Sequence, residues 1–137
     1  MDLSESKRTG IAEQFDQVAF AHLLGLRLGH VSHGEATLHM NVRDELKQNK
    51  GLLHGGVIAS LIDTAAAFAV LTVLEESERA ATVDLTVKYL RRVTGGQITA
   101  RAVVLRTGRR LAFLSAEVSD ESQVIVATAL TTFARQP

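Results

Sequence analysis

The hydrophobic positions of this chain form one long apolar run in the middle and alternating patterns on both sides of it. Residues 55–74 contain a single charged residue, Asp63, among small and apolar side chains. This run predicts a helix over residues 54–76, and a helix that is apolar all round is normally buried on all sides. About 20 apolar residues can also span a bilayer. The carboxylate and the hydroxyl groups within the run favour a buried helix at the centre of a globular fold.

Alternating hydrophobic and polar residues predict about six strands around this helix. Two lie before it, over residues 26–32 and 35–42, and four lie after it, over residues 82–90, 97–106, 109–119 and 123–134. The connections are short, so we expect antiparallel pairing, because parallel strands need long crossovers. A further amphipathic helix is predicted over residues 11–25. The pattern indicates an α+β fold in which an antiparallel sheet packs against one long central helix.

The strand predicted over residues 82–90 has the cleanest alternation of all. We expect one face of this strand to carry Val83, Leu85, Val87 and Tyr89. The opposite face is expected to carry Thr82, Asp84, Thr86 and Lys88.

Length and composition narrow the class of protein. A chain of 137 residues is near the commonest domain size, so we expect one domain over residues 1–137. The net charge is zero, which gives no general case for a nucleic-acid partner. The chain has no cysteine, so disulfides and thiolate chemistry are excluded. The first ten residues are polar and lack the apolar core of an export signal, so we expect a cytoplasmic protein with no membrane partner.

The apolar run also carries the strongest candidate chemistry. A carboxylate in such a helix is costly to ionise unless it is paired, which makes Asp63 a candidate functional group. The run opens on His54-Gly55-Gly56. The first N–H groups of a helix have no intrahelical partner, and glycines let a substrate oxygen approach them closely. We expect an oxyanion-binding site here, although an ordinary loop with a surface histidine is the plainer alternative.

Charge is distributed unevenly along the chain. Residues 85–116 contain no acidic residue, and their basic residues are Lys88, Arg91, Arg92, Arg101, Arg106, Arg109 and Arg110. These side chains are either solvated strand ends or a binding strip for the phosphates of a ligand. His30 and His33 lie at a predicted turn without a matching carboxylate pair, so we expect exposed histidines and no metal site.

Residues 48–56, Gln-Asn-Lys-Gly-Leu-Leu-His-Gly-Gly, followed by Asp63, resemble the active-site segment of PaaI-type (phenylacetate-degradation-like) acyl-CoA thioesterases. Residues 82–91 and the dipeptide Gly108-Arg109 are also similar to that family. The resemblance covers nearly the whole chain. It implies a hotdog fold, in which a sheet wraps a central helix. It also implies an enzyme that hydrolyses an acyl-CoA thioester to a free acid and coenzyme A, without a cofactor.

The resemblance implies a role for each matching residue. His54 would hydrogen-bond the thioester carbonyl or orient the leaving thiol, and the Gly55 N–H would stabilise the oxyanion. Asp63 would act as nucleophile or as general base on water, and the Thr82 hydroxyl would position that water. Gln48 belongs to the expected catalytic set, with its neighbour Asn49 as an alternative if the register is shifted. The residues expected to contact substrate are Asn49, Gly56, Arg91, Arg92, Arg109 and Arg110.

Helix geometry places the two halves of this predicted site too far apart within one chain. Gly55 and Asp63 are eight residues apart, which corresponds to about 12 Å along a helix axis. Attack on a thioester needs the nucleophile and the oxyanion donor at one carbonyl group. Two antiparallel helices in a two-fold dimer would bring Gly55 of one chain to Asp63 of the other. We therefore expect a homodimer with shared sites. The family is dimeric or tetrameric, so the resemblance also implies a dimer of dimers.

Other functions stay open on the sequence. A non-catalytic acyl-CoA-binding hotdog module with a regulatory role is the main alternative, and a hotdog dehydratase or hydratase is a second. The sequence does not distinguish an aryl from a straight-chain acyl group. Phe68, Leu71 and Phe133 could line an acyl pocket, but we expect them to pack in the core.

Overall fold

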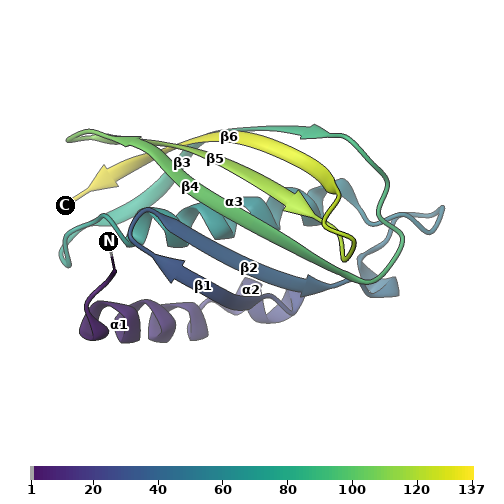
Figure 1. The fold of residues 1–137 in the computed structure, drawn as a ribbon, viewed down its shortest axis with the longest axis horizontal. Helices are drawn as coiled ribbons and strands as arrows, with labels where there is room; N and C mark the ends of the chain where they lie inside the picture. The colour runs from purple at the N-terminus through teal and green to yellow at the C-terminus, as the bar shows by residue number, and fades with distance from the viewer. Residues whose placement is uncertain (1) are drawn as a thin grey trace.

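The computed structural model describes residues 2–137 and places six antiparallel strands over one long helix, α3 (Gly55–Leu71) (Figure 1). The strands are β1 (Arg27–Ser32), β2 (Glu35–Asn41), β3 (Arg79–Tyr89), β4 (Gln97–Thr107), β5 (Leu111–Ser119) and β6 (Ile125–Gln136). Their order across the sheet is β1-β2-β4-β5-β6-β3, so β1 and β3 form the two edges. The predicted α+β fold with a six-stranded antiparallel sheet is confirmed.

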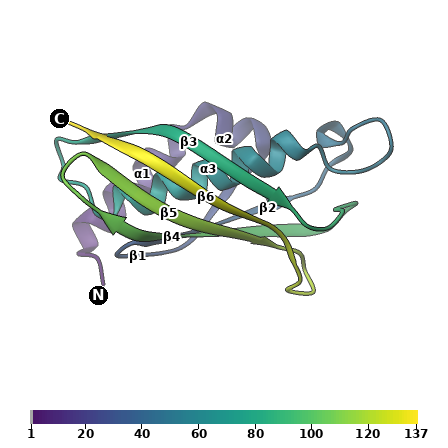
Figure 2. The ribbon, with the colours of Figure 1, turned by 90° about the horizontal axis from the view of Figure 1, so that it is seen from above.

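Helix α3 lies along one face of the sheet because one side of it is apolar (Figure 2). Its buried side chains are Ile58, Leu61, Ile62, Ala65, Ala66, Phe68, Ala69 and Val70. They share one core with the inward residues of β2, β4, β5 and β6. The expectation of burial on all sides is wrong, because a stripe of α3 is only half-covered: Val57, Ser60, Asp63, Thr64, Ala67 and Leu71.

The long helix ends at Leu71, five residues before the predicted end. The Thr72 hydroxyl donates to the Ala69 carbonyl at 2.7 Å and accepts from the Gly34 N–H at 2.7 Å. This residue is buried, so the end of α3 is tied to the β1–β2 turn. Leu74 then turns back into the core, although its sequence continues the apolar run. Of the residues described, no helix is both long and apolar enough to cross a bilayer.

The N-terminal helix predicted over residues 11–25 is two helices, α1 (Glu5–Asp16) and α2 (Ala19–Leu24). Ser4 begins α1 by accepting the Lys7 N–H at 3.1 Å. The break falls at Val18, whose backbone is extended and lets the two helices bury separate faces. The predicted stop at Gly25 is confirmed, since this glycine takes the left-handed conformation with φ +72°.

A β-bulge in β3 changes the predicted faces of that strand. The register against β6 shifts between Thr82 and Asp84, so Val83 is the extra residue. Val83 is 56% exposed and does not share the inward face with Leu85 and Val87. The bulge instead turns Thr82 toward α3. Perfect alternation on this strand was therefore a wrong prediction at its first residues.

An ion pair holds the segment after α3 to the β4–β5 turn. Arg135 donates to both carboxylate oxygens of Glu78, at 2.6 and 3.0 Å, and also to Thr107 Oγ1 and the Gly108 carbonyl at 3.0 Å each. The Arg135 hydrogen bonds, followed by the Glu75 N–H, lower the pKa of Glu78 below its ordinary value of 4.5. One arginine thus fixes the turn that carries Arg109 and Arg110.

We predict that Glu78→Gln flattens the acid limb of the stability profile. Because the pKa of Glu78 is lowered in the folded state, its contribution is present above the unfolded pKa near 4.5 and is lost as the pH falls through the folded pKa. Urea unfolding across the acid range should show a shallower pH dependence for Glu78→Gln than for the wild type. The matched control is exposed Glu76→Gln, which should keep the wild-type slope; equal slopes for all three proteins would contradict the prediction.

Candidate functional site

The start of α3 is capped by its own histidine. His54 is the N-cap residue, and its Nδ1 accepts the Gly56 N–H at 2.8 Å. A nitrogen that accepts an amide hydrogen carries no hydrogen itself, so the neutral ring bears its hydrogen on Nε2. The exposed ring of His54 therefore offers an Nε2–H donor to an incoming carbonyl or thiol.

Both glycines at the helix start lie against close side-chain neighbours. A Cβ on Gly56 would lie 3.0 Å from His54 Nδ1, and one on Gly55 would lie 3.3 Å from two ring carbons of Tyr89. Tyr89 also donates its hydroxyl to the Gly55 carbonyl at 2.7 Å. The glycines thus let two rings close against the first turn of α3.

The Gly55 N–H is the free donor of this helix start. Within residues 2–137 it has no acceptor, whereas the Gly56 and Val57 N–H groups bond to His54. The positive end of the helix dipole lies at the same place. A backbone N–H at a helix start, bare of side chain, is the arrangement that stabilises a developing oxyanion.

Asp63 lies two turns further along α3, on its half-covered side. It is half-buried, and its Oδ1 accepts the hydroxyl of Thr82 from β3 at 2.8 Å. Thr82 reaches α3 because the bulge at Val83 turns it inward. The hydroxyl fixes one carboxylate oxygen, and the other is left for a water molecule or a substrate carbon.

The single chain does not bring these two halves together. Gly55 and Asp63 are on the same continuous helix, so the axial offset of about 12 Å holds. The edge strand β3 runs past both, with Tyr89 beside Gly55 and Thr82 beside Asp63. One chain by itself therefore holds the Gly55 N–H and the Asp63 carboxylate at separate turns of α3.

Gln48 and Asn49 lie in an exposed loop between the 3₁₀ turn η1 (Asp44–Leu46) and α3. The loop is closed by the Gln48 N–H, which donates to the Leu52 carbonyl at 2.8 Å, and by Gly51 with φ +78°. It projects beyond the first turn of α3 (Figure 1). The structure therefore places Gln48 near the His54 end of the helix and away from Asp63 of its own chain.

The four arginines do not form one strip. Arg91 and Arg92 follow the end of β3, whereas Arg109 and Arg110 lie in the β4–β5 turn. These two places are at opposite ends of the sheet (Figures 1 and 2). All four side chains are exposed, so within one chain the predicted phosphate strip is two separate pairs.

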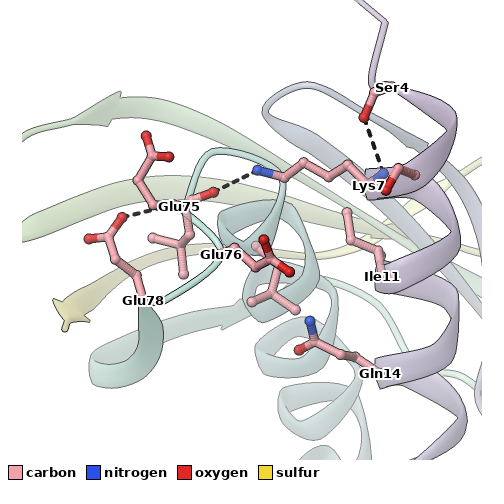
Figure 3. Close-up of a pocket in the computed structure, with 11 residues that line it drawn as sticks. Ser4, Lys7, Ile11, Gln14, Glu75, Glu76 and Glu78 are labelled. Atoms are coloured by element: carbon pink, nitrogen blue, oxygen red, sulfur yellow. Dashed lines mark hydrogen bonds between the residues drawn. The ribbon is translucent and has the colours of Figure 1, made fainter.

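The aromatic candidates for an acyl pocket pack in the core, as expected. Phe68 and Phe133 are buried, and Phe68 meets Phe15 edge to face at 5.3 Å. Leu71 instead lines a cavity of about 330 Å³ between α1 and the end of α3, with Ile11 and Lys7 (Figure 3). This cavity is lined by neither Asp63 nor His54. The predicted exposure of His30 and His33 is confirmed.

The fold and the helix start together define a hotdog-type protein with a thioesterase-like site, and comparison with known proteins gives the same class. A sequence model of the thioesterase superfamily matches residues 50–127. The chain belongs to the thioesterase superfamily.

Individual relatives agree with this assignment. The medium/long-chain acyl-CoA thioesterase YigI of Salmonella typhimurium is 33% identical over 129 residues, with 83% of each chain covered. The PaaI protein from the phenylacetic acid degradation operon of Escherichia coli superimposes with a TM-score of 0.91 at 26% identity, covering 99% of this chain and 97% of that one. A thioesterase family protein from Silicibacter pomeroyi has a TM-score of 0.89 at 25% identity, covering 95% and 98%.

Sequence reasoning missed the contact between Tyr89 and Gly55. The signal present in the sequence was an aromatic residue at the end of an edge strand together with two adjacent glycines, but neither shows which ring fills which space. It also missed the bulge, because nothing in the alternation of residues 82–90 marks Val83 as an extra residue.

We predict that Thr82→Val lowers thioester turnover by about tenfold. The substitution keeps the shape of the side chain but removes the only hydroxyl that donates to Asp63 in the described structure, which frees the carboxylate to rotate. Steady-state hydrolysis measured by thiol release checks this. Thr82→Ser keeps the donor and should retain most of the activity; equal losses for Val and Ser would show that the hydroxyl is not the important group.

Proposed function

We propose that this protein hydrolyses acyl-CoA thioesters to a free acid and coenzyme A. The observation that carries the proposal is the pairing, on one helix, of a free N–H at a glycine-opened start with a carboxylate held by a threonine. A thioester needs these two things: a donor for the developing oxyanion and a positioned nucleophile or base. The named acyl-CoA thioesterase relative supports the same reaction.

The proposed roles follow from the hydrogen-bond donor or the carboxylate oxygen that each residue leaves unpaired. The Gly55 N–H binds the thioester oxygen as it becomes an oxyanion, and the His54 Nε2–H hydrogen-bonds the same carbonyl or the leaving sulfur. Asp63 either attacks the carbonyl carbon directly or takes a proton from an attacking water. In the direct route the carbon–sulfur bond breaks as a mixed anhydride forms on Asp63, and water then hydrolyses this anhydride to the free acid and regenerates the carboxylate. In the general-base route the attacking water forms the new carbon–oxygen bond and the carbon–sulfur bond breaks. In both routes coenzyme A leaves as the thiol and one water is consumed.

We propose that each site is built from two chains of a homodimer. The offset of about 12 Å separates Gly55 from Asp63 within a chain. The stripe of α3 that its own sheet leaves half-covered contains Asp63 together with Ser60 and Ala67, residues small enough for close approach of a second helix. An antiparallel α3 from a second chain would cover this stripe. It would place Gly55 of each chain beside Asp63 of the other.

The free edge of β3 fits the same arrangement. Val83, Tyr89 and Leu90 on or just after this strand are all more than half exposed. A second copy placed antiparallel along the edge would bring the Thr82 end of one β3 to the Tyr89 end of the other, and with them Asp63 to Gly55. The domain of residues 1–137 would then act as one half of a symmetric unit, and pairing of such dimers into tetramers is a further step of the proposal.

The two pairs of arginines also fit this dimer. The ends of the sheet that lie far apart in one chain lie close together across an antiparallel pair, so Arg91 and Arg92 of one chain would approach Arg109 and Arg110 of the other. Such a group of exposed guanidinium groups suits the phosphates of coenzyme A. Gln48 and Asn49, beside the His54 end, would line the same substrate channel.

We predict that the wild type releases thiol from acyl-CoA and that Asp63→Asn lowers turnover by at least about 100-fold. A panel of aryl and straight-chain acyl-CoA substrates, followed with a thiol reagent, measures both. Asparagine keeps the size and the Thr82 contact but removes the charge, so the variant should fold as the wild type does. A wild type that binds acyl-CoA without hydrolysing any member would favour the non-catalytic binding module.

We predict that two inactive variants restore activity when mixed. Asp63→Asn removes one half of the site, and Gly55→Val covers the free N–H and presses on Tyr89. After dissociation and refolding, a mixed dimer has one intact site and one site with both changes. Activity should approach about one quarter of wild type when half of the dimers are mixed. Native mass spectrometry confirms mixing, and no recovery with mixed dimers present would show that each site lies within one chain.

A further inference from the structure

The first peptide group of α3, between Gly55 and Gly56, is held at both of its polar atoms. Its carbonyl oxygen accepts the Tyr89 hydroxyl at 2.7 Å, and its N–H donates to His54 Nδ1 at 2.8 Å. The bond to the histidine is local, two residues away. The bond to the tyrosine comes from β3, 34 residues further along the chain.

This support is needed because two glycines open the helix. Glycine rotates freely about its backbone, so a helix start made of two glycines has no side chains to fix its direction. The N–H and the carbonyl group of Gly55 are joined through the two rotatable backbone bonds of that residue. Holding the carbonyl therefore restricts where the free N–H can point.

Tyr89 is anchored on its other side by the sheet. It pairs with Ala127 on β6, and the following N–H groups of Leu90 and Arg91 both donate to the Val126 carbonyl, at 2.8 and 3.2 Å. Its side chain is 52% exposed, so burial alone does not hold the ring in place. The hydroxyl bond and the packing of the ring on Gly55 give it a defined position.

We propose that Tyr89 is a positioning residue of the thioesterase site, whose hydroxyl aims the Gly55 N–H at the substrate oxygen. The inference rests on the proposed function for its catalytic part. Tyr89 does not touch the reacting atoms; it acts through the Gly55 carbonyl. The sheet thereby sets the direction of an oxyanion donor that lies on the helix, and the glycine pair stays open to substrate.

The kinetic test is Tyr89→Phe, which removes one oxygen atom and keeps the ring against Gly55. Removing an oxyanion donor outright costs about 10²–10³ in kcat. A donor that is present but less well aimed should cost less, and we expect kcat to fall about tenfold with KM changed by less than about twofold. A purely structural role would lower the melting temperature without lowering kcat selectively over KM.

Thr72→Val is the matched control. The Thr72 hydroxyl also donates to a backbone carbonyl, that of Ala69, at the same 2.7 Å. It is buried and lies at the opposite end of α3 from Gly55. We expect Thr72→Val to lower the melting temperature more than Tyr89→Phe and to leave kcat unchanged. A kcat loss of similar size in both variants would overturn the positioning role.

A second measurement decides the proposal without reference to activity. In ¹H–¹⁵N spectra, Tyr89→Phe should shift or broaden the Gly55 and Gly56 amide signals and speed their hydrogen exchange, whereas Thr72→Val should not. Unchanged Gly55 and Gly56 signals would overturn the proposal even in an active enzyme. A wild type inactive on every acyl-CoA would overturn the proposed function, and with it the catalytic part of the inference, while the spectra still decide whether Tyr89 orders the start of α3.

Discussion

The rigid rise of one helix is the constraint on which the rest of this structure depends. Both halves of the proposed site lie on α3, and a helix cannot fold back to join residues eight positions apart. The sheet buries one side of α3 through residues such as Leu61 and Ile62, which fixes the helix firmly. The same packing leaves Asp63 on the side that the sheet does not cover. The proposed activity therefore depends on what covers the Asp63 side of α3.

The edge strand β3 connects the sheet to both halves of the proposed site. At one end it supplies Thr82 to Asp63, and at the other it supplies Tyr89 to Gly55. The bulge at Val83 makes this possible, because a regular strand would turn Thr82 outward while Tyr89 faced the helix. One extra residue in a strand thus lets two contacts seven positions apart serve the same helix. An edge strand also has free backbone groups, so the element that supports the site is the one that can pair with another chain.

The first turn of α3 is ordered although its glycines have a low intrinsic preference for the helix. Glycine at Gly55 and Gly56 disfavours a helix but leaves an N–H that a substrate can reach. His54 and Tyr89 replace the missing side chains from outside, each through a short hydrogen bond. The positive end of the helix dipole is then both open and fixed. Further along α3, Asp63 is the only charged residue of the helix.

The sequence by itself determined the elements and the candidate residues of the proposed site. An apolar run with one carboxylate and alternating strands with short turns are local patterns, so they predicted the central helix and the antiparallel sheet and singled out His54, Gly55 and Asp63 as candidates. Only the tertiary structure decided which partners these groups meet. The early end of α3 at Thr72, the bulge at Val83, the contact of Tyr89 with Gly55 and the separation of the arginines all depend on strand order and register. Those are set by long-range packing, in which residues far apart in the chain compete for the same space, and no local pattern records the outcome.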